Sequence, residues 1–121
     1  SFGVGALLPL LFSATGHIFL SFVPPDEIEP LLKRGLPSSK MTAKDVTALR
    51  ERVRAAGHAH VEGTMIPGLR ATAFPIFDLQ GRAILSATAL LPAGFDGGDG
   101  EVEARLAETC REASRQLGWT G

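Results

Sequence analysis

Apolar residues recur at helical spacing in four parts of this chain. The first part follows Ser13, a residue type that caps helix starts, and ends at Pro24-Pro25, which cannot continue a helix. Its inward positions are Ile18, Phe19, Phe22 and Val23. A second, shorter helix is expected over residues 26–33, with Gly35 just past its end and a loop over residues 36–41.

Two longer helices are predicted further along the chain. Thr42 and Asp45 have the spacing of a capping box, and Gly57 ends the helix that they start. Its apolar positions are Val46, Leu49, Val53 and Ala56. The last helix ends at Gly118, and its apolar stripe is expected to comprise Val102, Leu106, Cys110, Ala113 and Leu117.

Strands are expected between these two helices. Residues 58–62 form a short strand, and the apolar runs 69–77 and 82–91 flank Asp78-Leu79-Gln80-Gly81, which predicts a β-hairpin. Pro75 restricts part of the first run to a sheet edge or a bulge. Residues 94–100 are glycine-rich and predict a loop. Helices combined with antiparallel strands indicate the α+β class.

Composition narrows the functional classes. A chain of 121 residues with 45% hydrophobic and 21% charged residues suits one folded domain. Its net charge of −1 gives no basic field for nucleic-acid binding by this chain alone. The single cysteine excludes an internal disulfide, and we expect a cytoplasmic location. The apolar residues 2–23 are interrupted by Pro9, Gly16 and His17, so we interpret them as core and expect no membrane contact.

Short motifs follow one another in a recognisable order. Val4-Gly5, Leu8-Pro9-Leu10, Thr15-Gly16 and Phe19-Leu20-Ser21-Phe22 precede Pro24-Pro25. Gly57-His58, Pro67-Gly68-Leu69, Ala73-Phe74-Pro75-Ile76-Phe77-Asp78, Gly81 and Leu117-Gly118 follow the third helix. None of these motifs is specific by itself. Their order and spacing resemble the C-terminal effector-binding domain of the IclR family of bacterial transcriptional regulators over nearly the whole chain.

This resemblance implies a GAF-like (profilin-like) domain in which helices flank an antiparallel sheet. It also implies that residues 1–121 are a single effector-binding domain, a partial one that lacks its first strands and the upstream winged helix-turn-helix domain. The expected partners are a small-molecule effector and further copies of the chain in a homodimer or homotetramer. DNA would be contacted only through the absent N-terminal domain. We expect neither enzymatic activity nor a cofactor.

The resemblance also suggests an effector site at the start of the first long helix and on the neighbouring strands. Amide groups in the first turn of a helix lack intrahelical partners and attract anions. Carried over to this chain, the site residues are Ala14, Thr15, Val61, Leu69, Ala71, Thr88 and Leu90. Among these side chains only the two threonines form hydrogen bonds. The composition favours a ligand with an anionic end and a hydrophobic body, such as an aromatic acid.

Three alternatives to a sensor site remain open. In the first alternative, the seven residues are part of the hydrophobic core, the pocket is collapsed, and the domain serves only to form oligomers. In the second alternative, the chain is a GAF-like module of another signalling protein. In the third, it is a small enzyme, although Ser13, Ser86 and Ser114 suggest no catalytic triad. A sensor would act by linkage, because effector binding that favours one oligomer arrangement changes the spacing of the DNA-binding domains.

Other candidate residues have simpler explanations. His58, His60 and Glu62 alternate on a strand and suit a metal ion, but a solvated strand face explains them better and we expect no metal site. His17 lies near the helix start, where a histidine can sense ligand charge or pH, but we expect it to cap the helix or to pack as a structural residue. Cys110 lies within an apolar stripe and is interpreted as a small buried side chain.

Overall fold

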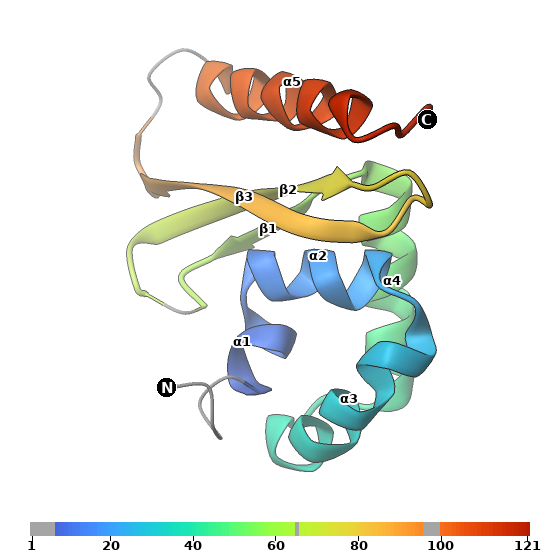
Figure 1. The fold of residues 1–121 in the computed structure, drawn as a ribbon. Coiled ribbons are helices and arrows are strands. Elements are labelled where there is room, and N and C mark those ends of the chain that lie inside the picture. The colour runs from blue at the N-terminus through green and yellow to red at the C-terminus, as the bar shows by residue number, and fades with distance from the viewer. Residues whose placement is uncertain (1–6, 65, 96–99) are drawn as a thin grey trace.

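Helices cover both faces of a three-stranded antiparallel sheet (Figure 1). This computed structural model describes residues 7–64, 66–95 and 100–121, without the side chains of residues 7–9 and 38. The elements are α1 (Leu7–Phe12), α2 (Ala14–Phe22), α3 (Pro25–Ser39), α4 (Ala43–Ala56), β1 (Ala59–Glu62), β2 (Leu69–Phe77), β3 (Ala83–Pro92) and α5 (Glu101–Gln116). The predicted α+β class is confirmed, and the predicted helices and strands occur in the expected order. α1 is an additional helix that was not predicted from the sequence. No helix in the described ranges has the length and apolarity that crossing a membrane requires.

The β2–β3 hairpin forms as the sequence predicts. The Asp78 amide donates to the Arg82 carbonyl across 2.9 Å, and the Asp78 carboxylate accepts from the Gln80 amide. Gly81 has a φ of 81°, which favours glycine. Pro75 lies beyond Ala73, where β1 stops pairing with β2, so this part of the central strand is an edge. The bulge comes just after it, between Ile76 and Phe77.

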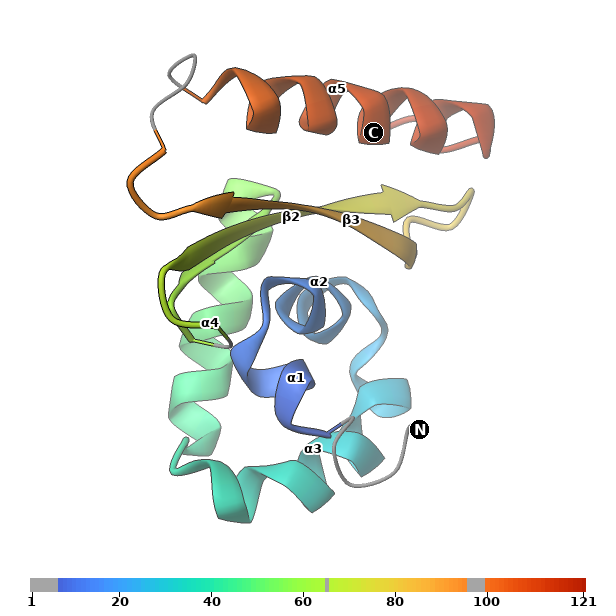
Figure 2. The ribbon, with the colours of Figure 1, turned by 90° about the vertical axis from the view of Figure 1, so that its left-hand side faces the viewer.

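The core lies between the sheet and α2, with α1 and α3 on the far side of α2 (Figure 2). Ile18 and Leu20 of α2 are fully buried. The carbonyls of Leu20 and Ser21, at the end of α2, accept hydrogen bonds from the Nε groups of Arg50 and Arg54 on α4. These bonds satisfy backbone acceptors that the helix itself leaves unpaired, and they join α2 to α4.

The extent of α3 differs from the prediction. The helix does not end near residue 33 but continues to Ser39, so the loop expected over residues 36–41 is confined to the two residues that follow the helix. Gly35 is buried within the helix and continues the inward face of Ile28 and Leu32. Lys40, with a φ of 65°, is the residue that ends the helix.

The capping box of α4 is confirmed. The Asp45 amide donates to the Thr42 hydroxyl, and the Thr42 amide donates to the Asp45 carboxylate. Gly57 ends the helix in the left-handed conformation, and its amide donates to the Val53 carbonyl across 2.8 Å. The β1 strand follows at once, which places the end of α4 beside the sheet.

The apolar stripe predicted for α5 is partly wrong. Cys110 is buried, but Val102 and Leu117 are 40% and 45% exposed, and the fully buried residue is Ser114. The Ser114 hydroxyl accepts from the Phe77 amide and donates to the Cys110 carbonyl. The middle of the predicted stripe therefore faces inward, and the buried face of the helix also includes a polar residue, Ser114, which bonds to the bulged end of β2. The loop predicted over residues 94–100 falls mostly outside the described residues.

Candidate functional site

A hollow of about 160 Å³ lies between the start of α2 and the adjacent face of the sheet. Its walls come from α2, from all three strands and from the connection between β1 and β2. The lining residues are Ser13, Ala14, Thr15, Val61, Gly63, Thr64, Ile66, Leu69, Ala71, Thr88 and Leu90. Its surface is mainly apolar.

The seven residues proposed for the effector site all line this hollow. Sheet register explains the strand residues, because Val61 pairs with Ala71 and Ala71 pairs with Leu90. Directly paired residues share a face of an antiparallel sheet. Their common location is a feature of the structure, whereas their role in binding stays a prediction.

The side of the hollow formed by Gly63, Thr64 and Ile66 was not predicted from the sequence. The Gly63 amide donates to the Leu69 carbonyl across 2.8 Å, which brings the connection back over the sheet. Gly63 and Gly68 both have positive φ values, 67° and 84°. Two glycines bounding a short connection between strands were the available signal of a tight return.

The start of α2 presents backbone amides at the hollow. Ser13 caps the helix, since its hydroxyl accepts from the Gly16 amide at 2.9 Å and its carbonyl accepts from the His17 amide. The amides of Ala14 and Thr15 are earlier in the turn and have no intrahelical acceptor. No lysine, arginine or histidine lines the hollow in the described ranges. An anion placed there would be held by amides and by the positive end of the helix dipole.

Two hydroxyl groups connect α2 to β3 within the same wall. The Oγ1 atoms of Thr15 and Thr88 lie 2.7 Å apart, a hydrogen-bond distance. Because one hydroxyl of such a pair donates to the other, the accepting hydroxyl keeps its own proton for a ligand. The structure adds a third threonine to the predicted two, since Thr64 also lines the hollow.

His17 is a buried structural residue outside this lining. Its Nε2 lies 2.6 Å from the Leu11 carbonyl, an acceptor, so this nitrogen carries the proton. Burial lowers the pKa of His17, the hydrogen bond to Leu11 opposes that shift, and the positive charge of Arg52 adds to it. The imidazole thereby joins the end of α1 to α2 in its neutral form.

The other candidates lie away from the hollow. His60 directs Nδ1 toward the Thr72 hydroxyl at 2.7 Å and Nε2 toward a Glu62 carboxylate oxygen at 3.2 Å. No group of three potential metal-ligating side chains occurs in the described part of the chain. Cys110 is a buried free thiol whose pKa is raised by burial.

Comparison with known proteins identifies the family. The family model described as bacterial transcriptional regulator IclR C-terminal matches residues 2–119. The chain belongs to this family. Its fold is accordingly the GAF-like fold of IclR C-terminal domains. The family is one of transcriptional regulators and not an enzyme family. No curated protein matched the chain in sequence.

Solved structures of IclR-type regulators share this fold. HmgR of Pseudomonas aeruginosa is 33% identical with a TM-score of 0.81, and the match covers 94% of this chain and 47% of HmgR. The IclR protein of Thermotoga maritima is 26% identical with a TM-score of 0.74, over 91% of this chain and 47% of that protein. The C-terminal domain of E. coli KdgR is 24% identical with a TM-score of 0.74, over 92% and 72% respectively. The chain thus spans about half the length of the two whole regulators.

Proposed function

We propose that this chain is the effector-sensing and oligomerising domain of an IclR-type regulator, and that the effector is a small organic acid bound at the start of α2. The observation that carries the proposal is the hollow itself. It combines helix amides that lack intrahelical acceptors, two hydroxyls and mainly apolar walls within one hollow. Such a combination of an apolar cavity with a few convergent polar groups is typical of small-molecule sites.

Size and polarity define the ligand class. An engineered apolar cavity of about 150 Å³ in another protein admits a benzene ring, so a hollow of 160 Å³ suits one ring. The walls around the ring would be Val61, Leu69 and Leu90. The carboxylate would accept from the amides of Ala14 and Thr15 and from the free threonine hydroxyl. This arrangement favours an aromatic acid over a wholly polar one.

The regulatory step follows from linkage. An effector that contacts both α2 and β3 stabilises the distance between these two elements at which it binds most tightly. If that spacing differs between arrangements of a homodimer or homotetramer, binding shifts the assembly and changes the separation of the winged helix-turn-helix domains. DNA contact in the cytoplasm belongs to those domains, because the present chain has a net charge of −1.

The outer edge of β3 supports the expectation that the complete domain has further strands. Leu85 and Leu90 are 56% and 60% exposed on opposite faces of this strand. The strand extends for ten residues without a charge. Native edge strands of this length are normally protected by charges or by a covering element. A further strand of the same protein, paired with β3, would bury this surface.

Thermal unfolding of the full-length protein in the presence of aromatic acids tests the proposed function. A carboxylate such as benzoate should raise the midpoint saturably, and benzamide should do so much less. Ala71→Leu fills the hollow, and Thr88→Val removes one hydroxyl, so both changes should weaken the shift. Thr72→Val is the matched control, because Thr72 pairs with Ala89 on the opposite face of the sheet.

Two outcomes would count against the proposal. A folded protein that shows no shift with any small acid supports the alternative, a purely oligomerising domain with a collapsed pocket. A shift that survives Ala71→Leu places the ligand elsewhere.

A further inference from the structure

A second and larger hollow lies at the opposite end of α2. It has a volume of about 440 Å³ and is bounded by the end of α4, the last residues of β2, the inner face of α5 and Trp119, which follows α5. Only one α2 residue lines it, Phe22 from the last turn, whereas the first hollow takes its α2 residues from the first turn. The two lining sets share no residue, so the second hollow is a separate candidate site.

Five lining residues of this hollow carry aromatic rings, namely Phe22, His58, Phe74, Phe77 and Trp119. The Phe77 and Trp119 rings lie 4.8 Å apart between centroids and are tilted by 32°. The His58 and Phe74 rings lie 5.5 Å apart and are tilted by 37°. Phe22 contacts Phe77 edge to face at 5.2 Å. Ring faces and edges of this kind favour a planar aromatic partner, in stacked or edge-to-face contact.

The backbone along this hollow does not favour an added β-strand. The pairing of β1 with β2 ends at Ala73, which leaves residues 74–77 without a partner on that side. Pro75 has no amide hydrogen, and the Phe77 amide already donates to the Ser114 hydroxyl across 2.9 Å. Strand addition depends on main-chain donors and acceptors, so this edge gives a peptide little to bind. A small planar molecule fits the available groups better.

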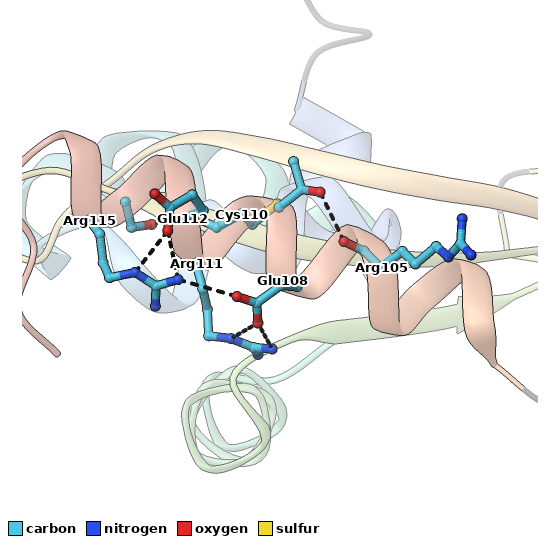
Figure 3. A network of polar contacts seen from close by, with 8 residues as sticks. Arg105, Glu108, Cys110, Arg111, Glu112 and Arg115 are labelled. Carbon is cyan, nitrogen blue, oxygen red and sulfur yellow. Dashed lines mark hydrogen bonds and ion pairs between the residues drawn. The ribbon is translucent and has the colours of Figure 1, made fainter.

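The charges around the hollow favour an anion. The Nε of Arg54 donates to the Ser21 carbonyl at 2.7 Å, and neither Arg54 nor His58 forms an ion pair in the described part of the chain. The positive charge of Arg54 also contributes to a lowered pKa of Arg50, after the larger effect of burial. Arg111, on α5, is already paired with Glu108 by two hydrogen bonds of 2.7 and 3.2 Å (Figure 3). Arg54 is therefore the guanidinium available to a ligand.

We propose that this hollow binds a planar aromatic carboxylate, whose ring packs against the Phe74 and Phe77–Trp119 surfaces and whose carboxylate pairs with Arg54. The proposal does not depend on the effector site at the start of α2. The two sites differ in the source of positive charge, which is a guanidinium here and backbone amides there. They also differ in size, because 440 Å³ accommodates a larger acid than a hollow of 160 Å³.

Trp119 provides a local readout. The full-length protein is labelled with 5-fluorotryptophan, and the ¹⁹F resonance of residue 119 is assigned by its loss in Trp119→Phe. Titration with trans-cinnamate should move this resonance saturably, whereas cinnamamide, which has the same ring without the charge, should bind about tenfold more weakly. Arg54→Gln and Phe74→Leu should each raise the dissociation constant for cinnamate by about tenfold.

Control variants keep the test specific. Arg52→Gln removes a charge from the same helix outside the hollow and should leave binding unchanged. Thr88→Val and Ala71→Leu alter only the first hollow and should also leave it unchanged. The proposal is overturned by an absence of a saturable shift in the folded protein or by equal weakening in Arg52→Gln and Arg54→Gln. It is equally overturned if Ala71→Leu abolishes the shift, because the ligand then occupies the first hollow.

Discussion

Replacing Ser114 with alanine should destabilise the domain although alanine is the more apolar residue. Ser114 is 1% exposed, and its hydroxyl accepts from the Phe77 amide across 2.9 Å while donating to the Cys110 carbonyl. The substitution leaves the Phe77 amide without this acceptor at a half-buried position. This bond links two segments that are far apart in the sequence, so its loss affects the docking of α5 on the sheet.

The size of the effect follows from two opposing contributions. Leaving a buried amide unpaired costs about 1–3 kcal/mol. Alanine in place of serine within a helix returns about 0.5 kcal/mol of helix propensity. We therefore expect the free energy of unfolding to fall by about 0.5–2.5 kcal/mol on the basis of these contributions.

Thr109→Ala is the matched control. The Thr109 hydroxyl makes the same type of bond within α5, to the Arg105 carbonyl at 3.0 Å, but it is exposed and accepts from no distant amide. This change should be neutral or slightly stabilising.

Urea unfolding of the full-length protein, followed by circular dichroism, measures both effects, and hydrogen exchange identifies the group responsible. Ser114→Ala should accelerate exchange of the Phe77 amide more than exchange of other β2 amides. Equal stabilities of Ser114→Ala and Thr109→Ala, with Phe77 still protected, would refute the reasoning.

Three further predictions concern other buried polar groups. His17→Gln should flatten the dependence of the free energy of unfolding on pH. The lowered pKa of His17 in the folded state contributes stability that is complete above the unfolded-state pKa of about 6.5 and is lost as the pH falls through the folded-state pKa. Urea unfolding between mildly acidic and neutral pH measures this dependence, and an unchanged pH dependence in the variant contradicts the prediction. A double-mutant cycle of Thr15→Val and Thr88→Val should give a coupling energy of about 1 kcal/mol for their hydrogen bond, whereas additive effects would show that the contact contributes nothing. Cys110 should react with a thiol reagent only on unfolding, since it is buried and its pKa is raised; rapid labelling of the native protein would disprove this.

Local signals made several elements predictable. The capping box of α4 and the turn between β2 and β3 each depend on residues within about five positions, so the sequence contains their whole cause. The limits of α3 and the buried face of α5 depend on distant partners. Gly35 lies buried within α3 and does not end it, and the buried Ser114 hydroxyl bonds to the Phe77 amide, 37 residues away. No hydrophobic periodicity contains that information.

The candidate site shows the same division. Its strand and helix residues came from the resemblance to a family, while the apolar pattern by itself does not distinguish a pocket wall from a core. The third side, formed by Gly63, Thr64 and Ile66, depends on the long-range return from Gly63 to Leu69. Family resemblance predicted the site residues that lie on helices and strands, but it did not predict those on the connection between β1 and β2.

The position of α2 relates the two proposed sites. Its first turn lines one hollow, its last turn contributes Phe22 to the other, and a nine-residue helix spans only about 13 Å. Arg54, which is proposed to pair with a carboxylate in the second hollow, also donates to the Ser21 carbonyl at the end of this helix. Ligands bound in the two proposed sites would therefore both contact α2. Any coupling between the two ligands must be reciprocal. If an aromatic acid at the start of α2 raises the affinity for cinnamate by some factor, cinnamate raises the affinity for that acid by the same factor.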